Sequence, residues 1–133
     1  MEDKKTILAI DDNKMDLMVL SNFLSQKYDL RLLKSGGDAL VFLNTTTVDI
    51  ILLDIAMPSM SGFEFLHELR KNPKQMQIPV IVVSSYGTPD FVEYAKKKGA
   101  DDCLSKPVNA EILQQKIEKV LKTPSRAGLL AGL

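Results

Sequence analysis

Two short runs of β-branched and leucine residues constrain the fold of this chain more than any other feature. The first occupies residues 48–53, where Asp49 is the single polar residue, and the second occupies residues 79–83. Runs of this kind, without polar alternation, are typical of strands buried on both faces of a parallel sheet. The first run leads directly into Asp54 and the second into Ser84. We therefore expect a parallel sheet with polar side chains at the carboxyl ends of its strands.

Strands and helices are expected to alternate along the chain. The expected strands are residues 6–10, 30–33, 48–53, 79–83 and 102–105. The expected helices are residues 13–26, 38–43, 63–70, 89–99 and 109–121. This alternation predicts right-handed crossovers and a doubly wound α/β domain, with helices on both faces of a five-stranded parallel sheet.

The spacing of apolar residues predicts which sides of the first and last helices pack on the sheet. In the first helix the apolar positions are Met15, Met18, Leu20, Phe23 and Leu24. In the last helix they are Ile112, Leu113, Ile117, Val120 and Leu121. The pair Gly36-Gly37 is expected to break the chain before the second helix begins at residue 38.

Length and charge limit the classes of function that the chain can serve. Its 133 residues are enough for one compact domain, which we expect at residues 1–122, with residues 123–133 forming a C-terminal tail or linker. Because 17 basic residues balance 17 acidic ones, no net field favours direct nucleic acid binding. No apolar stretch approaches the roughly 20 residues of a membrane span. With the single cysteine, Cys103, these features predict a cytoplasmic protein.

Polar residues follow four of the expected strands at the points where those strands end. Asp11 and Asp12 follow the first strand, Asp54 the third, Ser84 the fourth and Lys106 the fifth. The carboxyl ends of parallel strands meet at one edge of the sheet, so we expect these side chains to converge. Three neighbouring carboxylates repel one another unless a cation relieves them, and Mg²⁺ prefers such oxygen ligands. With an ammonium and a hydroxyl group beside them, the set predicts a phosphoryl-transfer site.

The order of these residues resembles that of the response-regulator receiver family of two-component signalling, over roughly residues 5 to 122. The resemblance rests on Asp11, Asp12, Asp54, Met57, Pro58, Gly62, Ser84, Lys106 and Pro107. Each motif is weak alone, but their placement at successive strand ends is specific. The resemblance implies a flavodoxin-like (βα)5 fold of strand order 2-1-3-4-5.

The resemblance also implies a role for each site residue. Asp54 would accept a phosphoryl group from a phosphohistidine of a sensor histidine kinase or a phosphotransfer protein. Mg²⁺ would be bound by Asp12, by Asp54 and by the main-chain carbonyl of Ala56, with Asp11 acting through water. Lys106 would pair with the phosphoryl oxygens.

Ser84, by the same resemblance, would donate a hydrogen bond to the phosphoryl group. The domain would then signal through the face formed by its fourth helix, fifth strand and fifth helix, and it could form a homodimer there. Its only reactions would be its own phosphorylation and dephosphorylation, so it is expected to be a signalling domain rather than an enzyme. Its downstream target is not indicated by the sequence.

The sequence departs from the family pattern on the fifth strand. Cys103 stands three residues before Lys106, where the family usually carries tyrosine or phenylalanine. A cysteine cannot fill and vacate a pocket as an aromatic ring does, so coupling to the output face is expected to be altered. Ala56 and Tyr86, two residues beyond Asp54 and Ser84, are expected to influence the lifetime of the phosphoryl group.

Three other functions are compatible with parts of the pattern. A phosphatase or mutase of the haloacid dehalogenase type needs a second acid two residues after the nucleophile, where this chain has Ala56. A pseudo-receiver that binds partners without phosphorylation is compatible with Cys103, although the complete acid set favours chemistry. A flavodoxin-like nucleotide-binding domain is disfavoured because no glycine-rich loop follows the first strand.

Overall fold

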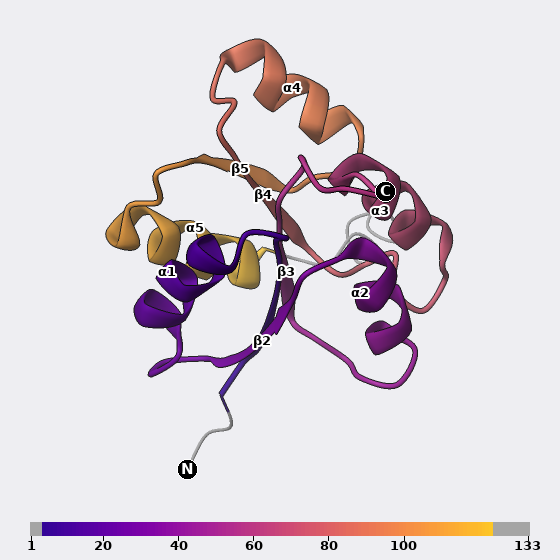
Figure 1. Cartoon of the computed structure of the whole chain (residues 1–133), viewed down its shortest axis with the longest axis horizontal. Helices are drawn as coiled ribbons and strands as arrows, with labels where there is room; N and C mark the ends of the chain where they lie inside the picture. Colours follow the sequence, from indigo (N-terminus) through magenta and orange to yellow (C-terminus); the bar gives the residue numbers. More distant parts are fainter. Residues whose placement is uncertain (1–3, 124–133) are drawn as a thin grey trace.

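The protein forms five parallel strands connected by five helices (Figure 1). The computed structural model describes residues 4–123. The strands are β1 (Thr6–Ile10), β2 (Asp29–Leu33), β3 (Ile50–Leu53), β4 (Val80–Ser84) and β5 (Asp102–Ser105). The helices are α1 (Lys14–Leu24), α2 (Gly36–Leu43), α3 (Gly62–Lys71), α4 (Pro89–Lys97) and α5 (Ala110–Lys122). Apart from Thr123, the predicted tail at residues 123–133 lies outside the described residues.

The sheet has the order β2-β1-β3-β4-β5, and all four pairs of neighbouring strands are parallel. Helices α1 and α5 cover one face, while α2, α3 and α4 cover the other (Figure 1). The predicted doubly wound fold and its strand order are therefore confirmed. None of the helices within residues 4–123 is both long enough and apolar enough to cross a membrane.

Each face of the sheet has its own hydrophobic core. β3 and β4 are buried along their whole length, as expected for strands covered on both sides. Phe65 is fully buried in the core beneath α2, α3 and α4, and Ile117 is fully buried in the core beneath α1 and α5. Removal of this apolar area from water is the main stabilising contribution to the sandwich.

Each helix begins at a polar residue whose side chain accepts hydrogen bonds from the first turn. These N-cap residues are Asn13, Ser35, Ser61, Thr88 and Asn109. The caps satisfy main-chain N–H groups that have no partner within a helix. The predicted break at Gly36-Gly37 is wrong, because the cap at Ser35 starts α2 at Gly36 and places both glycines in its first turn.

Three predicted core positions are exposed. The exposed fractions of Met15 and Met18 are 67% and 50%, and that of Ile112 is 45%. In α1 the buried stripe is Leu17, Leu20 and Leu24. Steps of three and four residues keep these leucines on one side of a helix with 3.6 residues per turn, and the methionines fall outside that stripe.

Candidate functional site

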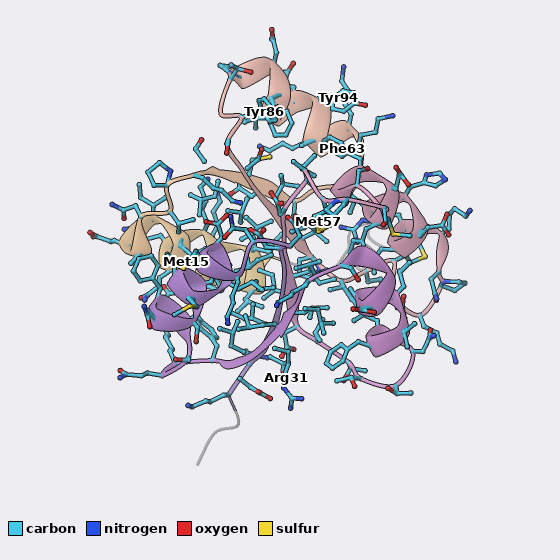
Figure 2. The ribbon with its side chains drawn as sticks, viewed as in Figure 1. Met15, Arg31, Met57, Phe63, Tyr86 and Tyr94 are labelled. Atoms are coloured by element: carbon cyan, nitrogen blue, oxygen red, sulfur yellow. The ribbon has the colours of Figure 1, made fainter. Side chains whose placement is uncertain are left out.

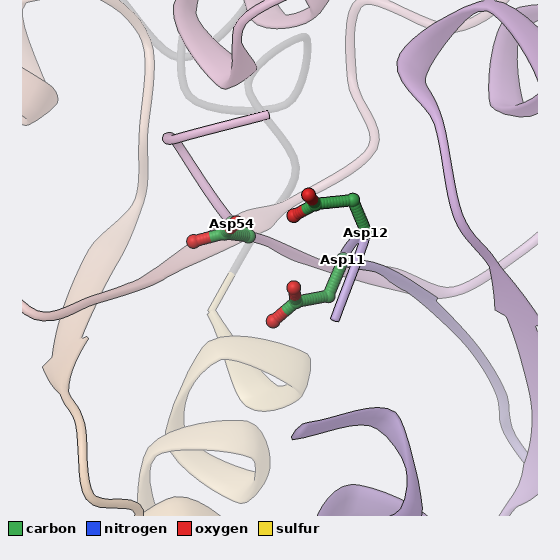
Figure 3. A group of neighbouring side chains, drawn as sticks. All are labelled: Asp11, Asp12 and Asp54. Carbon is green, nitrogen blue, oxygen red and sulfur yellow. The ribbon is translucent and has the colours of Figure 1, made fainter. Parts of the chain in front are cut away.

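Three carboxylates meet at the carboxyl edge of the sheet. Asp11 and Asp12 follow β1 and Asp54 follows β3, so neighbouring strands deliver all three (Figure 3). One oxygen atom from each can be chosen such that all three lie within 4.8 Å of one another. Asp11 and Asp54 are buried, with exposed fractions of 3% and 7%, whereas Asp12 is exposed. The sequence-based prediction that these acids converge is confirmed.

Main-chain hydrogen bonds continue the sheet ladder into the site. The Asp54 N–H donates to the carbonyl of Ile10 at 2.9 Å, and the Asp11 N–H donates to the carbonyl of Leu33 at 3.1 Å. The Asp11 carboxylate in turn accepts from the N–H of Asn13 at 2.9 Å. These bonds fix the backbone of both buried acids, so little conformational freedom remains to be lost when the site binds a ligand.

Gly62 lets helix α3 begin directly beside the phosphoacceptor candidate. Its N–H donates to the carbonyl of Ile55 at 2.8 Å, which holds the loop after β3 against the start of the helix. A Cβ atom at this position would collide with the carbonyl oxygen of Asp54 and would lie 2.7 Å from the Cα atom of Ile55. Only a residue without a side chain fits this close approach of two backbone segments.

Lys106 extends from the end of β5 into the cluster of acids. Its Nζ atom lies 2.9 Å from Asp11 Oδ2, 3.4 Å from Asp54 Oδ1 and 2.7 Å from Asp16 Oδ2. The peptide bond between Lys106 and Pro107 is cis. The predicted meeting of Lys106 with the acids is confirmed, but Asp16 is a partner that sequence reasoning missed. The available signal was its place in the first turn of α1, four residues after Asp12.

The surroundings of the site shift the pKa values of Asp54 and Lys106. Burial raises the pKa of Asp54, the charge of Asp11 raises it further, and Lys106 opposes both effects. Burial on its own lowers the pKa of Lys106, but the hydrogen bonds that Lys106 donates to Asp16 and Asp11 outweigh burial and raise the pKa above its ordinary value. Lys106 is therefore a permanent ammonium beside a carboxylate whose negative charge is disfavoured.

Ser84 is the last residue of β4 and is buried. Its main chain lies beside that of Lys106. The Lys106 N–H donates to the carbonyl of Ser84 at 2.8 Å, which ties the ends of β4 and β5 together. The Ser84 Oγ atom accepts from the N–H of Tyr86 at 3.1 Å. Ala56, whose main-chain carbonyl was predicted as a metal ligand, lies two residues beyond Asp54 and is exposed.

A series of aromatic rings leads away from Ser84 across α4 and α3. Ring centroids lie 5.6 Å apart for Tyr86 and Phe91, 6.0 Å for Phe91 and Phe63, and 5.1 Å for Phe63 and Tyr94. Figure 2 shows Tyr86, Phe63 and Tyr94 on this side of the molecule. The series takes its rings from α3, α4 and the loop before α4, which is separate from the position on β5 where the family usually has an aromatic residue.

Cys103 occupies that position on β5 and packs, partly buried, against the core beneath α2, α3 and α4. Burial raises the pKa of its thiol, and the nearby charge of Asp102 raises it further. The thiol is therefore protonated at neutral pH and behaves as a small apolar side chain.

The residues of the site fit a hard cation and an anionic ligand. Within residues 4–123, Asp11, Asp12 and Asp54 are the group of acids close enough to share one metal ion. Oxygen ligands alone suit Mg²⁺ better than zinc, which favours nitrogen and sulfur. The ammonium of Lys106 and the hydroxyl of Ser84 lie on the same edge of the sheet, so both charge and hydrogen bonding favour a phosphoryl group there.

Comparison with known proteins relates most of the chain to one family. A family model described as the response regulator receiver domain matches residues 7–118. The protein PilH of Pseudomonas aeruginosa is 34% identical over 117 residues, covering 86% of this chain and 96% of its own length. A probable cyclic di-GMP phosphodiesterase of Vibrio cholerae is 33% identical over 94% of this chain, but the chain spans only 28% of that protein.

Solved structures have the same architecture. The chemotaxis protein CheY4 of Vibrio cholerae is 28% identical with a TM-score of 0.82, covering 88% of this chain and 98% of its own. The signal receiver domain of a histidine kinase from Syntrophus aciditrophicus is also 28% identical, with a TM-score of 0.80 and coverage of 90% and 95%. A receiver domain from Pseudomonas aeruginosa, described with magnesium in its active-site cleft, shares the fold at 24% identity and a TM-score of 0.82, covering 90% and 99%.

Proposed function

The chain belongs to the response-regulator receiver family, and from this membership we propose that Asp54 is the phosphoacceptor of a two-component phosphorelay. The observation that carries the proposal is the position of the Asp54 carboxylate, buried between two further acids and 3.4 Å from the ammonium of Lys106. A buried carboxylate with a purely structural role is stabilised by a cationic partner but is destabilised by neighbouring acids, whereas a carboxylate that receives a phosphoryl group needs cations on several sides.

Magnesium fits the donor set of this site. Asp12 and Asp54 would hold the ion directly and Asp11 through water, with the main-chain carbonyl of Ala56 as a further oxygen ligand. The ion would supply positive charge that offsets the repulsion among the acids and the charge on the phosphoryl oxygens. Asp12 is exposed, so the ion can reach the site from solvent without movement of the core.

The side chains around Asp54 suit an in-line displacement. A carboxylate oxygen of Asp54 forms a bond to phosphorus as the bond from phosphorus to the histidine nitrogen of the donor breaks, and the imidazole leaves with that electron pair. Lys106 and Ser84 donate to the phosphoryl oxygens, so they stabilise the charge spread over them. The Asp54 carboxylate already carries the attacking electron pair, so the step needs no general base.

The phosphodonor in this proposal is a sensor histidine kinase or a histidine phosphotransfer protein, and the domain is a signalling module rather than an enzyme. The unit that folds and reacts is proposed to be residues 1–122. Output is proposed at the face formed by α4, β5 and α5. Two observations support that face: its strand β5 is followed directly by Lys106, and Thr88 before α4 follows Ser84 by four residues. A movement of Lys106 would therefore act directly on β5, and a movement of Ser84 would act on the start of α4.

The test is intact-protein mass spectrometry after incubation with acetyl phosphate or phosphoramidate and Mg²⁺. The wild-type chain is expected to gain the mass of one phosphoryl group, and a chelator is expected to abolish the gain. Asp54→Asn should remain unmodified, while Asp38→Asn, an exposed acid in the first turn of α2, should react like the wild type. If the wild type gains no mass with either donor, the proposal is refuted and a phosphorylation-independent binding module is favoured.

A further inference from the structure

Lys106 has a carboxylate partner outside the acid triad. Among the described residues, Asp11, Asp54 and Asp16 lie within salt-bridge distance of its Nζ atom, and the shortest separation, 2.7 Å, is the one to Asp16. The separation from Asp54 is the longest of the three, at 3.4 Å. The ammonium is therefore drawn toward helix α1 and away from the phosphoacceptor.

The backbone of α1 fixes Asp16 in this position. Asp16 lies in the first turn, and its N–H donates to the side chain of the N-cap residue Asn13 at 3.1 Å. An acid in the first turn is favoured by the helix dipole, so its negative charge costs little there. Asp16 and Lys106 are both among the residues that line a cavity of about 120 Å³, so the lysine side chain has room to move beside the site.

The partners of Lys106 differ in what else they can bind. Asp11 and Asp54 belong to the triad that fits a cation, and Asp16 is not part of that triad. A cation bound by the triad would weaken the first two acids as partners for the ammonium, because its positive charge would repel Lys106 and would compete for their negative charge. The carboxylate that continues to attract Lys106 is then that of Asp16.

We infer that Asp16 is a positioning residue that holds Lys106 on the α1 side of the site in the unmodified domain, and that Lys106 exchanges Asp16 for the phosphoryl group when Asp54 is modified. This inference rests on the proposed phosphorylation of Asp54. The exchange has a cost, since the bond to Asp16 must break before the ammonium can pair with the phosphoryl oxygens. Asp16 therefore opposes phosphorylation and favours the unmodified state.

The size of the effect follows from the exposure of the pair. The side chains of Asp16 and Lys106 are 38% and 19% exposed, so solvent weakens their attraction relative to a fully buried pair. A partly exposed ion pair of this kind changes an equilibrium by roughly two- to fivefold. We therefore expect Asp16→Asn to raise the phosphorylated fraction by that factor at a limiting concentration of acetyl phosphate.

The first experiment measures the lysine itself, in metal-free protein. Brief treatment with acetic anhydride and peptide mass spectrometry give the acetylation rate of Lys106 relative to that of the exposed Lys74. Asp16→Asn should raise this ratio roughly two- to fivefold, because Lys106 loses its closest acceptor. Asp16→Glu, which keeps a carboxylate, should stay near the wild-type ratio. Asp38→Asn removes a first-turn acid from α2 without removing a partner of Lys106, so it should leave the ratio unchanged.

The second experiment measures phosphorylation of the same variants with Mg²⁺ and limiting acetyl phosphate. The inference is supported if Asp16→Asn reaches a higher phosphorylated fraction than both the wild type and Asp38→Asn, with Asp16→Glu close to the wild type. It is overturned if the Lys106 acetylation ratio does not change in Asp16→Asn. It is also overturned if the wild type is phosphorylated and Asp16→Asn reaches no higher phosphorylated fraction than the wild type. Absence of phosphorylation in the wild type would instead refute the role proposed for Asp54, while the acetylation ratio would still report whether Asp16 holds the lysine.

Discussion

Gly62→Ala is expected to disrupt the site although Gly62 itself neither binds nor reacts. The added Cβ atom would collide with the carbonyl oxygen of Asp54 and stand 2.7 Å from the Cα atom of Ile55. Both contacts are with backbone, so no side-chain rotation can relieve them. The start of α3 and the loop after β3 must move apart, and that loop carries Asp54.

The magnitude can be worked out by comparison with Gly37. Alanine in the first turn of a helix gains up to about 1 kcal/mol over glycine, because the unfolded chain has less freedom to lose. At Gly37 nothing lies within 4 Å of the added atom, so Gly37→Ala should realise this gain. At Gly62 the steric cost of inserting a methyl group into packed structure, about 1–3 kcal/mol, outweighs it. Because the entropic gain is common to both variants, we expect Gly62→Ala to be less stable than Gly37→Ala by the steric cost, about 1–3 kcal/mol.

Urea denaturation of the two variants and the wild type measures this difference in free energy of unfolding. Phosphorylation by acetyl phosphate under native conditions should also slow in Gly62→Ala, since Asp54 shifts relative to Lys106, and stay unchanged in Gly37→Ala. Equal stability of the two alanine variants would refute the steric reasoning. A destabilised Gly62→Ala with the wild-type phosphorylation rate would show that the loop moves without carrying Asp54.

Three further predictions concern pH, metal binding and the polar contacts of two arginines. The folded protein raises the pKa of Asp54, so ionisation of this group costs stability as pH rises. Asp54→Asn should therefore stabilise the metal-free domain at neutral pH. Thermal melts should show this gain disappearing toward pH 3, where the Asp54 carboxyl group is protonated in the wild type. Mg²⁺ should raise the melting temperature of the wild type, and Asp12→Asn should reduce that rise without abolishing folding. Arg70→Met should cost about 2–4 kcal/mol in urea denaturation, because the guanidinium donates to three main-chain carbonyls. Arg31→Met, at an exposed pair with a neighbouring carboxylate, should cost less than about 1 kcal/mol.

The sheet and the acid triad could be predicted because both follow from strand order. A run such as residues 50–53 is typical of a strand covered on both sides in a parallel sheet, and the residue that follows such a strand, Asp54, then lies at the carboxyl edge. Neighbouring strands bring Asp11 and Asp12 to the same edge by the same rule. No knowledge of side-chain packing was needed for these steps.

Asp16 could not be found in this way, because it lies on a helix rather than at a strand end. Its contact with Lys106 depends on how α1 is rotated on the sheet, and that rotation is set by the stripe of Leu17, Leu20 and Leu24. Sequence reasoning correctly assigned Leu20 and Leu24 to the core, but it added Met15 and Met18 and omitted Leu17, so it did not fix the rotation of the helix. Several apolar faces were available on α1, and only packing against the sheet decides among them.

The aromatic series beside Ser84 gives this domain a built-in optical reporter. The chain contains no tryptophan and three tyrosines, so its intrinsic fluorescence comes from tyrosine alone. Tyr86 and Tyr94 are both members of the series, while Tyr28 is buried in the core on the opposite face of the sheet. A change in tyrosine emission at the site therefore reports on the loop that follows β4 and on α4, while the buried Tyr28 adds a constant contribution to the same band. Events at the carboxyl edge of the sheet can thus be followed in real time without a label.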